Sequence, residues 1–237
     1  MESQRGTLFI VSTPIGNLLD ISPRAIECLK AADIIACEDT RHSGKLLSKY
    51  EIDTNRISLH KHNEASRTAH LIEKMKSGYD VAYITDAGTP LISDPGSRLV
   101  HLASSEDCEV VVIPGPSAVT AALAGSGFPA DRFYFGGFLS TKKKARQDEL
   151  QQALQRAETS IFFDSPYRIV STLEMLSVLE PERPIVVARE LTKKFEEFKR
   201  GNTLEVANLF SQKPVKGEIV IVISGASPPR WLNSKQT

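Results

Sequence analysis

Short apolar runs alternate with amphipathic segments along the first half of the chain. Runs rich in apolar and β-branched residues, which are typical of buried strands, occupy residues 7–12, 34–37, 80–84 and 109–113. Segments with apolar residues at helical spacing occupy residues 22–32, 65–76 and 99–103. Ser22 and Pro23 form a helix-start signal, and Gly78 a helix stop. Near-continuous apolar strands separated by helices predict a parallel sheet that is covered on both faces.

A stretch rich in proline and glycine, residues 114–130, surrounds a short alanine-rich helix and separates this half from a second one. Beyond it, the pattern predicts strands at residues 133–135, 161–163, 185–188, 195–199 and 218–223. Helices are predicted at residues 142–157, 167–179 and 204–210. We therefore expect an α/β protein of two α/β domains, residues 1–125 and 126–237. The first sheet should be mainly parallel and the second mixed.

Composition limits the classes of function. Hydrophobic residues make up 41% and charged residues 24% of the chain, as in soluble globular proteins, and the formal net charge is +0. Any polyanionic partner must therefore meet a local basic patch, such as Lys142, Lys143 and Lys144. The three cysteines form no CxxC pair, and no segment has the length of a signal peptide core or a membrane span. These features predict free thiols and a cytoplasmic protein without a membrane partner.

Three loops with a shared chemistry follow predicted strands of the first domain. They are residues 13–17 (TPIGN), 86–90 (DAGTP) and 114–118 (PGPSA). Ligands of parallel sheets bind at the carboxyl ends of strands, and such loops let a polar small molecule approach the backbone closely. Each loop alone is better explained as a turn, but three at one edge favour a ligand site. No G-x-G-x-x-G or Walker A motif accompanies them, which argues against NAD and nucleoside triphosphates in their usual modes.

Charged side chains at strand ends are candidates for chemistry. Asp86 either lines the ligand site or caps the turn at Gly88. Glu38, Asp39 and Arg41 follow another strand and form either a local ion pair or a substrate-facing site.

Other residues allow more than one interpretation. His60 and His62 would face one way on a strand, but without a third ligand nearby they do not predict a metal site. Lys142 to Lys144 open a helix and are either solvated or contact RNA phosphates. Tyr167, beside Arg168, is the best aromatic candidate for stacking on a base.

The motifs TPIGN, EDTR (residues 38–41), DAGTPLISDPG (86–96), PGPSA and SPYR (165–168) occur in this order, and together they resemble the ribosomal RNA small subunit methyltransferase I family. This family belongs to the tetrapyrrole-methylase-like, or class III, methyltransferases, and the resemblance runs from about Leu8 to Ser224. It implies a homodimer of two-domain chains that bind S-adenosylmethionine in a cleft between the domains. The implied reaction is 2′-O-methylation of one cytidine of 16S ribosomal RNA at the decoding centre of the small ribosomal subunit.

The resemblance also implies roles for individual residues. In the first domain it assigns the cofactor to Pro14, Asp86, Ala87, Gly88, Thr89, Ile92, Ser117 and Ala118. In the second domain it assigns the cofactor to Phe163, Glu190 and Gly217. Catalysis would fall to Glu38, Asp39 and Arg41, with the general base left open among Glu38, Asp39 and Glu190. RNA would contact Lys142, Lys143, Lys144, Tyr167 and Arg168.

Two other functions fit the same residues. One is a class III methyltransferase that acts on a tetrapyrrole or on another small or protein acceptor. The other is a non-catalytic binding protein that keeps the same loops. Family members commonly continue into a small helical region beyond the last strand, whereas this chain ends soon after Gly225. If that region helps to hold RNA, we expect RNA recognition to differ here.

Overall fold

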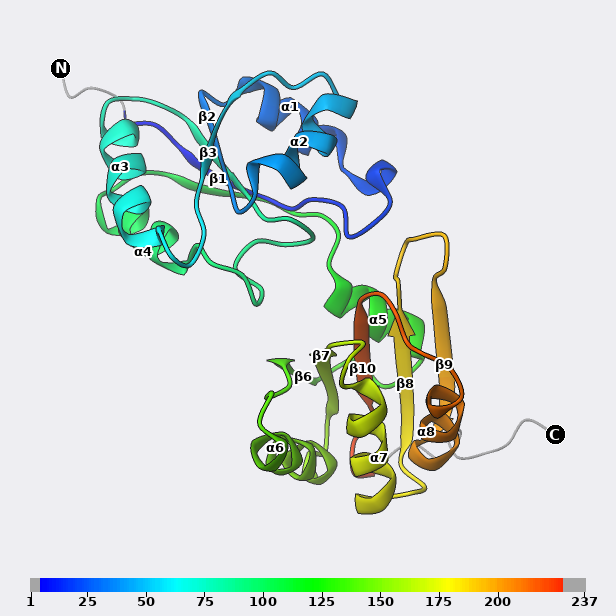
Figure 1. Ribbon diagram of the computed structural model, residues 1–237. Coiled ribbons are helices and arrows are strands. Elements are labelled where there is room, and N and C mark those ends of the chain that lie inside the picture. The colour runs from blue at the N-terminus through cyan, green and yellow to red at the C-terminus, as the bar shows by residue number, and fades with distance from the viewer. Residues whose placement is uncertain (1–4, 228–237) are drawn as a thin grey trace. The chain divides into compact units, whose positions relative to one another are not determined.

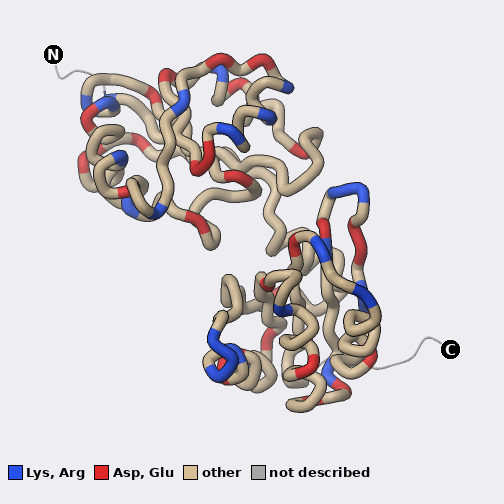
Figure 2. Tube along the Cα trace, viewed as in Figure 1, with Lys and Arg blue, Asp and Glu red and all other residues tan. Residues whose placement is uncertain are grey.

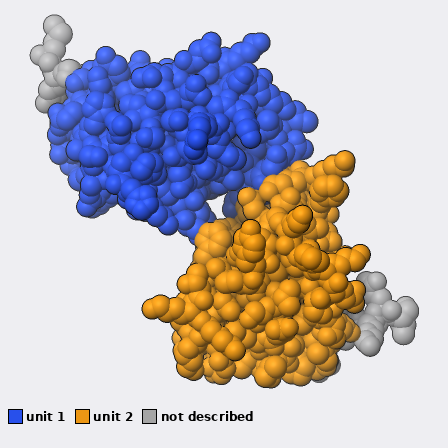
Figure 3. Space-filling model, viewed as in Figure 1, with its two compact units in different colours: residues 1–117 blue, residues 118–237 orange. Residues whose placement is uncertain are grey.

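The computed structural model describes residues 5–227 (Figure 1). The chain divides into two compact units, residues 1–117 and 118–237, which Figure 3 distinguishes by colour. Each unit is built around its own five-stranded sheet. No helix among the described residues is long and apolar enough to cross a membrane.

The sheet of the first unit is entirely parallel. Its strands are β1 (Leu8–Val11), β2 (Ile34–Cys37), β3 (Asn55–Ser58), β4 (Val81–Ile84) and β5 (Val110–Ile113). They lie in the order β3-β2-β4-β1-β5, so that β1 and β4 are neighbours at the centre. The predicted parallel sheet is confirmed.

Helices cover both faces of this sheet (Figure 1). The helical segments are η1 (Leu18–Asp20), α1 (Pro23–Ala31), α2 (Thr40–Lys49), α3 (Glu64–Lys76) and α4 (Ser97–Ser105). One core joins α1 and α2 to the sheet through Leu29, Leu47 and Ile35, and the other joins α3 and α4 through Leu71, Leu99 and Tyr83. Alternate residues of β1, β2, β4 and β5 enter opposite cores, which explains why these four strands are apolar throughout.

Two elements of this unit are absent from the sequence prediction. Helix α2 begins where the Asp39 side chain accepts hydrogen bonds from the backbone N–H groups of Arg41 and His42. Strand β3 is a half-exposed edge strand. His60 and His62 were placed on a strand, and this was wrong: both lie in the turn between β3 and α3.

The sheet of the second unit is mixed, as predicted. Its strands are β6 (Phe133–Phe138), β7 (Thr159–Asp164), β8 (Pro184–Arg189), β9 (Glu197–Asn202) and β10 (Ile219–Ile223), in the order β6-β7-β10-β8-β9. Only the β6–β7 pair is parallel. The helices are α5 (Ala118–Ser126), α6 (Lys143–Gln155), α7 (Ile169–Leu179) and α8 (Thr203–Ser211). The core lies between the sheet and α6, α7 and α8.

Helix α5 belongs to the second unit. It packs on β8, β9 and β10, where a Cβ atom added to Gly125 would collide with the ring of Phe198. Only glycine permits this close approach of helix and strand. The sequence places the domain boundary at the far end of this helix, after residue 125, whereas the compact units meet at its beginning.

A buried arginine ties together the segments at one end of the second unit. Arg183 is 5% exposed and donates hydrogen bonds to the carbonyl oxygens of Leu154, Ser224 and Gly225. Its guanidinium also pairs with the Glu180 carboxylate at 2.8 Å. These acceptors lie in separate segments, so one side chain holds the end of α6, the end of α7 and the end of β10 in place.

We predict that Arg183→Met destabilises the second unit strongly. The variant fills similar volume but leaves buried carbonyl oxygens without a donor, which costs about 3 kcal/mol in total. Thermal denaturation should show a midpoint lowered by roughly 6–12 °C for a chain of this size. Arg200→Met, at an exposed position of β9, is the control and should shift the midpoint far less. Equal shifts for the two variants would contradict the structural role of Arg183.

Candidate functional site

The loops after β1 and β4 are joined directly by their backbones. Thr13 N–H donates to the Gly88 carbonyl at 2.9 Å, and Gly88 N–H donates to the Thr13 carbonyl at 3.1 Å. Gly88 has a φ of 87°, and a Cβ atom there would lie 3.3 Å from Ile15 Cγ2. A side chain at this position would therefore be strained and crowded, so the bridge depends on glycine.

The hydroxyl of Thr89 connects all three predicted loops. It accepts a hydrogen bond from Ser12 Oγ at 3.1 Å and donates one to the Pro116 carbonyl at 3.2 Å. The loop after β5 also approaches closely, because a Cβ atom on Gly115 would lie 2.9 Å from Ser12 Cβ. The structure thus brings together the loops that contain Pro14, Gly88, Thr89 and Ser117 at the carboxyl edge of the sheet.

A group of carboxylates lies at the same edge, around Thr85. The Thr85 hydroxyl is 2.7 Å from Asp94 Oδ2 and 3.4 Å from Glu38 Oε2. Asp86 Oδ1 accepts a hydrogen bond from the backbone N–H of Asp39 at 3.3 Å, so its side chain contacts the β2 loop. Asp94 is absent from the predicted site residues although it lies inside the DAGTPLISDPG run.

The grouping of these carboxylates changes their acidity. Burial, together with the negative charges of Asp94 and Asp86, raises the pKa of Glu38. Burial and the charge of Asp86 likewise raise the pKa of Asp94, against the opposing hydrogen bond from Thr85. A carboxyl group with a raised pKa is a better proton acceptor than an ordinary surface carboxylate once it is ionised.

Asp39 and Arg41 have local structural partners. The Asp39 carboxylate caps α2, and those backbone hydrogen bonds lower its pKa. Arg41 NH2 lies 3.5 Å from Asp39 Oδ2, and its side chain is 91% exposed. The local ion pair considered from the sequence is therefore present, and Glu38 is the member of this motif that faces the other carboxylates.

Strained backbone is concentrated in the loops after β4 and β8. Among the described residues, six other than glycine have positive φ, and four of these lie in two such loops. Leu91 and Ser93 (φ 72° and 69°) lie after β4, and Glu190 and Thr192 (φ 51° and 65°) lie after β8. Such conformations cost of order 1–3 kcal/mol each and cluster at functional sites. The exposed residues Ala87 and Ile92 lie in the first of these loops.

The second unit brings Glu190 and Gly217 into contact. A Cβ atom added to Gly217, whose φ is 92°, would collide with the Glu190 side chain. Glu190 Oε1 accepts hydrogen bonds from Lys193 Nζ at 2.9 Å and from the backbone N–H of Glu218 at 3.0 Å. The hydrogen bond from Lys193 lowers the pKa of Glu190. This residue is therefore a fixed anion, which makes it a poor general base.

Phe163, the third predicted cofactor residue of this unit, lies in an aromatic group on the strands. Its ring centroid is 5.0 Å from that of Phe135 and 5.2 Å from that of Phe138, both in edge-to-face geometry. Phe138 is 62% exposed. The group offers an apolar aromatic surface at this end of β6 and β7.

The side chains predicted to contact RNA differ in their exposure and in whether they pair with a carboxylate of the chain. Lys142, Lys143 and Lys144 are exposed at the start of α6, where Figure 2 shows a cluster of basic residues. Tyr167 is 96% exposed, whereas Arg168 NH2 pairs at 3.2 Å with the buried Asp164 carboxylate. No group of three or more metal-binding side chains occurs among residues 5–227, and the His60 and His62 rings lie edge to face at 6.0 Å.

Comparison with known proteins shows which family the chain matches. Residues 7–207 match the family of tetrapyrrole (corrin/porphyrin) methylases. The chain is 48% identical over 224 residues to "Ribosomal RNA small subunit methyltransferase I" of Synechocystis sp., covering 94% of this chain and 80% of that protein. The protein of the same name from Bacillus subtilis is 43% identical over 95% of this chain and 77% of its own length.

Solved structures share the fold. Diphthine synthase superposes with a TM-score of 0.72 at 17% identity, covering 96% of this chain and 93% of that one. Uroporphyrin-III-C-methyltransferase from Thermus thermophilus superposes with a TM-score of 0.64 at 20% identity, covering 94% and 95%. These likenesses concern the fold, whereas the extent and identity of the sequence matches define the family. The chain therefore belongs to the tetrapyrrole (corrin/porphyrin) methylase family and, within it, to the ribosomal RNA small subunit methyltransferase I family.

Proposed function

We propose that this chain transfers a methyl group from S-adenosylmethionine to the ribose 2′-oxygen of a cytidine in 16S ribosomal RNA, at the decoding centre of the small subunit. The names of its relatives and the intact motifs support this function. The observation that carries the chemical part is the convergence of three loops on Thr89 at the sheet edge that also holds Glu38, Asp86 and Asp94. A cytoplasmic location and a homodimer belong to the same proposal.

The first unit has the chemistry that S-adenosylmethionine needs. The cofactor supplies an activated methyl group on a cationic sulfur. Carboxylates at this edge complement a positive charge, and the exposed Ala87 and Ile92 offer apolar surface for a flat base. Gly88 and Gly115 permit close approach to the loop backbones. Pro14, Ser117 and Ala118 complete the proposed contacts of this loop system, and Phe163, Glu190 and Gly217 are the separate candidates of the second unit.

Glu38 is the general base in this proposal. Asp39 is occupied as the cap of α2, and Glu190 is held as an anion by Lys193. Within residues 5–227 the Glu38 carboxylate accepts a long hydrogen bond from Thr85, and its pKa is raised by burial and by Asp94. It is thus the candidate whose proton affinity suits removal of a ribose hydroxyl proton, while Arg41 is exposed and available to a phosphate.

The function is tested by methyl transfer to a defined acceptor. Purified protein, labelled S-adenosylmethionine and small ribosomal subunits that lack the modification are incubated, and ribose methylation is mapped on the extracted RNA. We expect label on one cytidine 2′-oxygen and none on uroporphyrinogen III offered as an alternative acceptor. Label on the tetrapyrrole would assign the chain to another branch of the fold. Cofactor binding without transfer to either acceptor would support a non-catalytic protein.

We predict that Thr89→Arg abolishes cofactor binding. The long cation removes the hydroxyl that joins Ser12 to Pro116 and places a positive charge where a cationic sulfur should bind. Calorimetry should show at least a hundredfold loss of affinity for S-adenosylmethionine. Thr89→Ser keeps the hydroxyl and should stay within about threefold of the parent. Unchanged affinity in the arginine variant would place the cofactor elsewhere.

We predict that Glu38→Gln lowers kcat about a hundredfold or more, because a base is lost, while cofactor affinity falls far less because the loops, Asp86 and Asp94 are intact. Stability gives a second readout. The pKa of Glu38 is raised from 4.5, so the folded state binds its proton more tightly than the unfolded chain. Wild-type stability therefore falls as pH rises from 4.5 through the raised pKa.

The glutamine variant lacks this loss of stability. The midpoint of the variant minus that of the wild type should grow as pH rises and should level off above the raised pKa of Glu38. Glu27→Gln, on the exposed side of α1, is the matched control and should change neither kcat nor the pH dependence. If the difference in midpoint between Glu38→Gln and the wild type does not change with pH, the pKa of Glu38 is not raised in the folded protein.

A further inference from the structure

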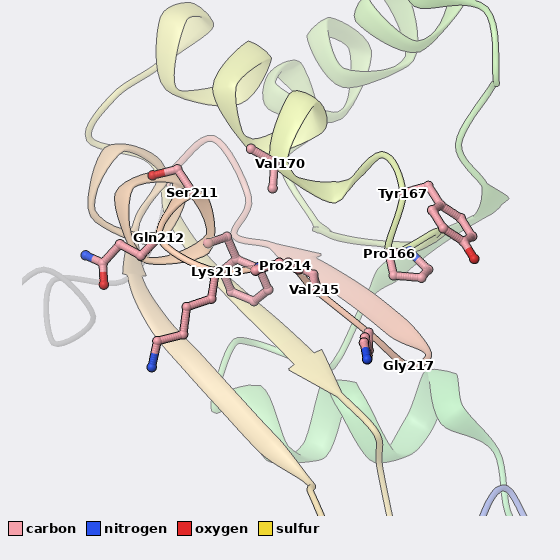
Figure 4. A pocket seen from close by; sticks show the side chains of 11 residues that line it. Pro166, Tyr167, Val170, Ser211, Gln212, Lys213, Pro214, Val215 and Gly217 are labelled. Carbon is pink, nitrogen blue, oxygen red and sulfur yellow. The ribbon is translucent and has the colours of Figure 1, made fainter.

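The second unit contains a pocket that shares only Gly217 with the proposed cofactor contacts. Its volume is about 720 Å³, within the range of small-molecule sites. Figure 4 shows Pro166 and Tyr167 at one end, Gln212 and Lys213 at the other, and Pro214 and Val215 between them. The walls thus come from the loop before α7, the end of α8 and the loop that leads to β10.

Tyr167 is presented at this pocket by a rigid loop. Asp164 has a fully buried side chain, and it accepts hydrogen bonds from Ser165 N–H at 2.8 Å and from Thr172 Oγ1 at 2.7 Å. It also pairs with Arg168 at 3.2 Å. Ser165 and Arg168, which flank Pro166 and Tyr167, are therefore both fixed to one buried carboxylate, while Tyr167 is 96% exposed. An exposed aromatic ring on a fixed loop loses little conformational entropy when it stacks on a ligand.

The charge around the pocket is positive. Lys213 and Lys216 line it, and neither has a salt bridge within the described part of the chain. No Asp or Glu is among its lining residues. The nearby Glu218 and Glu190 carboxylates both pair with Lys193. The apolar floor of Val170, Pro214 and Val215 thus carries an aromatic ring and two free cations at its rim.

We propose that this pocket binds a nucleotide of unpaired RNA. Its base stacks on Tyr167 and contacts the apolar floor, and its phosphates contact Lys213 and Lys216. Stacking requires a base whose face is accessible, which double-stranded RNA does not offer. The inference rests on the proposed function, because it names a place on the second unit where the RNA substrate is held. Arg168 is then a positioning residue for Tyr167 and makes no phosphate contact.

Fluorescence anisotropy with a short labelled single-stranded RNA tests the pocket without methyl transfer. Tyr167→Ala should weaken binding roughly fivefold or more, and Tyr167→Phe should bind nearly as the wild type does because it keeps the ring. The double variant Lys213→Gln, Lys216→Gln should reduce the slope of log affinity against log salt by about 1.4, since each phosphate contact contributes about 0.7. Arg168→Lys should weaken binding less than Tyr167→Ala.

Matched controls separate this site from general effects. Val178→Ala removes another exposed side chain of the same unit, which is 84% exposed, and should leave RNA affinity unchanged. Arg24→Gln with Lys30→Gln removes two exposed cations of α1 and should leave the salt slope unchanged. The second control removes the same number of positive charges as the lysine double variant, and the first removes an exposed apolar side chain outside the pocket.

Several outcomes would overturn the inference. They are a wild-type protein that does not bind the oligonucleotide, Tyr167→Ala binding as tightly as wild type, and Tyr167→Phe as weak as Tyr167→Ala. A parallel loss of affinity for S-adenosylmethionine in Tyr167→Ala would assign the pocket to the cofactor. Failure of the proposed function is distinguishable, because it appears as absent methyl transfer while Tyr167-dependent RNA binding persists.

Discussion

The backbone bridge between Thr13 and Gly88 is the constraint on which the first unit's site depends. Strands β1 and β4 are central neighbours, and both sheet faces are filled by apolar side chains, so polar groups are left to the strand ends. The bridge is an isolated antiparallel one beyond the parallel pairing of these strands, and it fixes the start of each loop. Thr89 then lies where its hydroxyl reaches both Ser12 and Pro116, and three loops become one structure.

The same arrangement stores unfavourable free energy at the strand ends. Leu91 and Ser93 adopt left-handed backbone, and Glu38 and Asp94 are partly buried near Asp86. The segment is held by hydrogen bonds from Thr85 to Asp94, from Tyr83 to the Pro95 carbonyl at 2.8 Å, and from Gly96 N–H to Glu64 at 3.0 Å. A site built this way is preorganised, since the surrounding core rather than the ligand holds the strained loop.

The sequence predicts those helices and strands whose residues all favour the same secondary structure. The apolar runs of β1, β2, β4 and β5 and the Ser22-Pro23 start of α1 are such signals. Helix α2 was not predicted because Gly44 and polar residues interrupt the spacing of its apolar residues. Its start signal, Asp39, is also a candidate catalytic residue, so it did not stand out as a helix cap. Asp94 is missing from the predicted site for another reason. Only the turns at Leu91 and Ser93 bring it back to Thr85, and left-handed backbone at residues other than glycine leaves no trace in composition.

Residue type alone also fails to separate cations that hold the fold from cations that can meet a ligand. Arg168, Arg183 and Arg146 all lie within the second unit, and each donates to buried or half-buried acceptors of the chain itself. Their guanidinium groups hold several segments at once, which suits the multiple donors of arginine. Lys213 and Lys216 have no such partners among the described residues and line a pocket free of carboxylates. A flexible ammonium at the rim retains its hydration and can still exchange it for a phosphate, so an anionic partner should meet the lysines of this unit before its arginines.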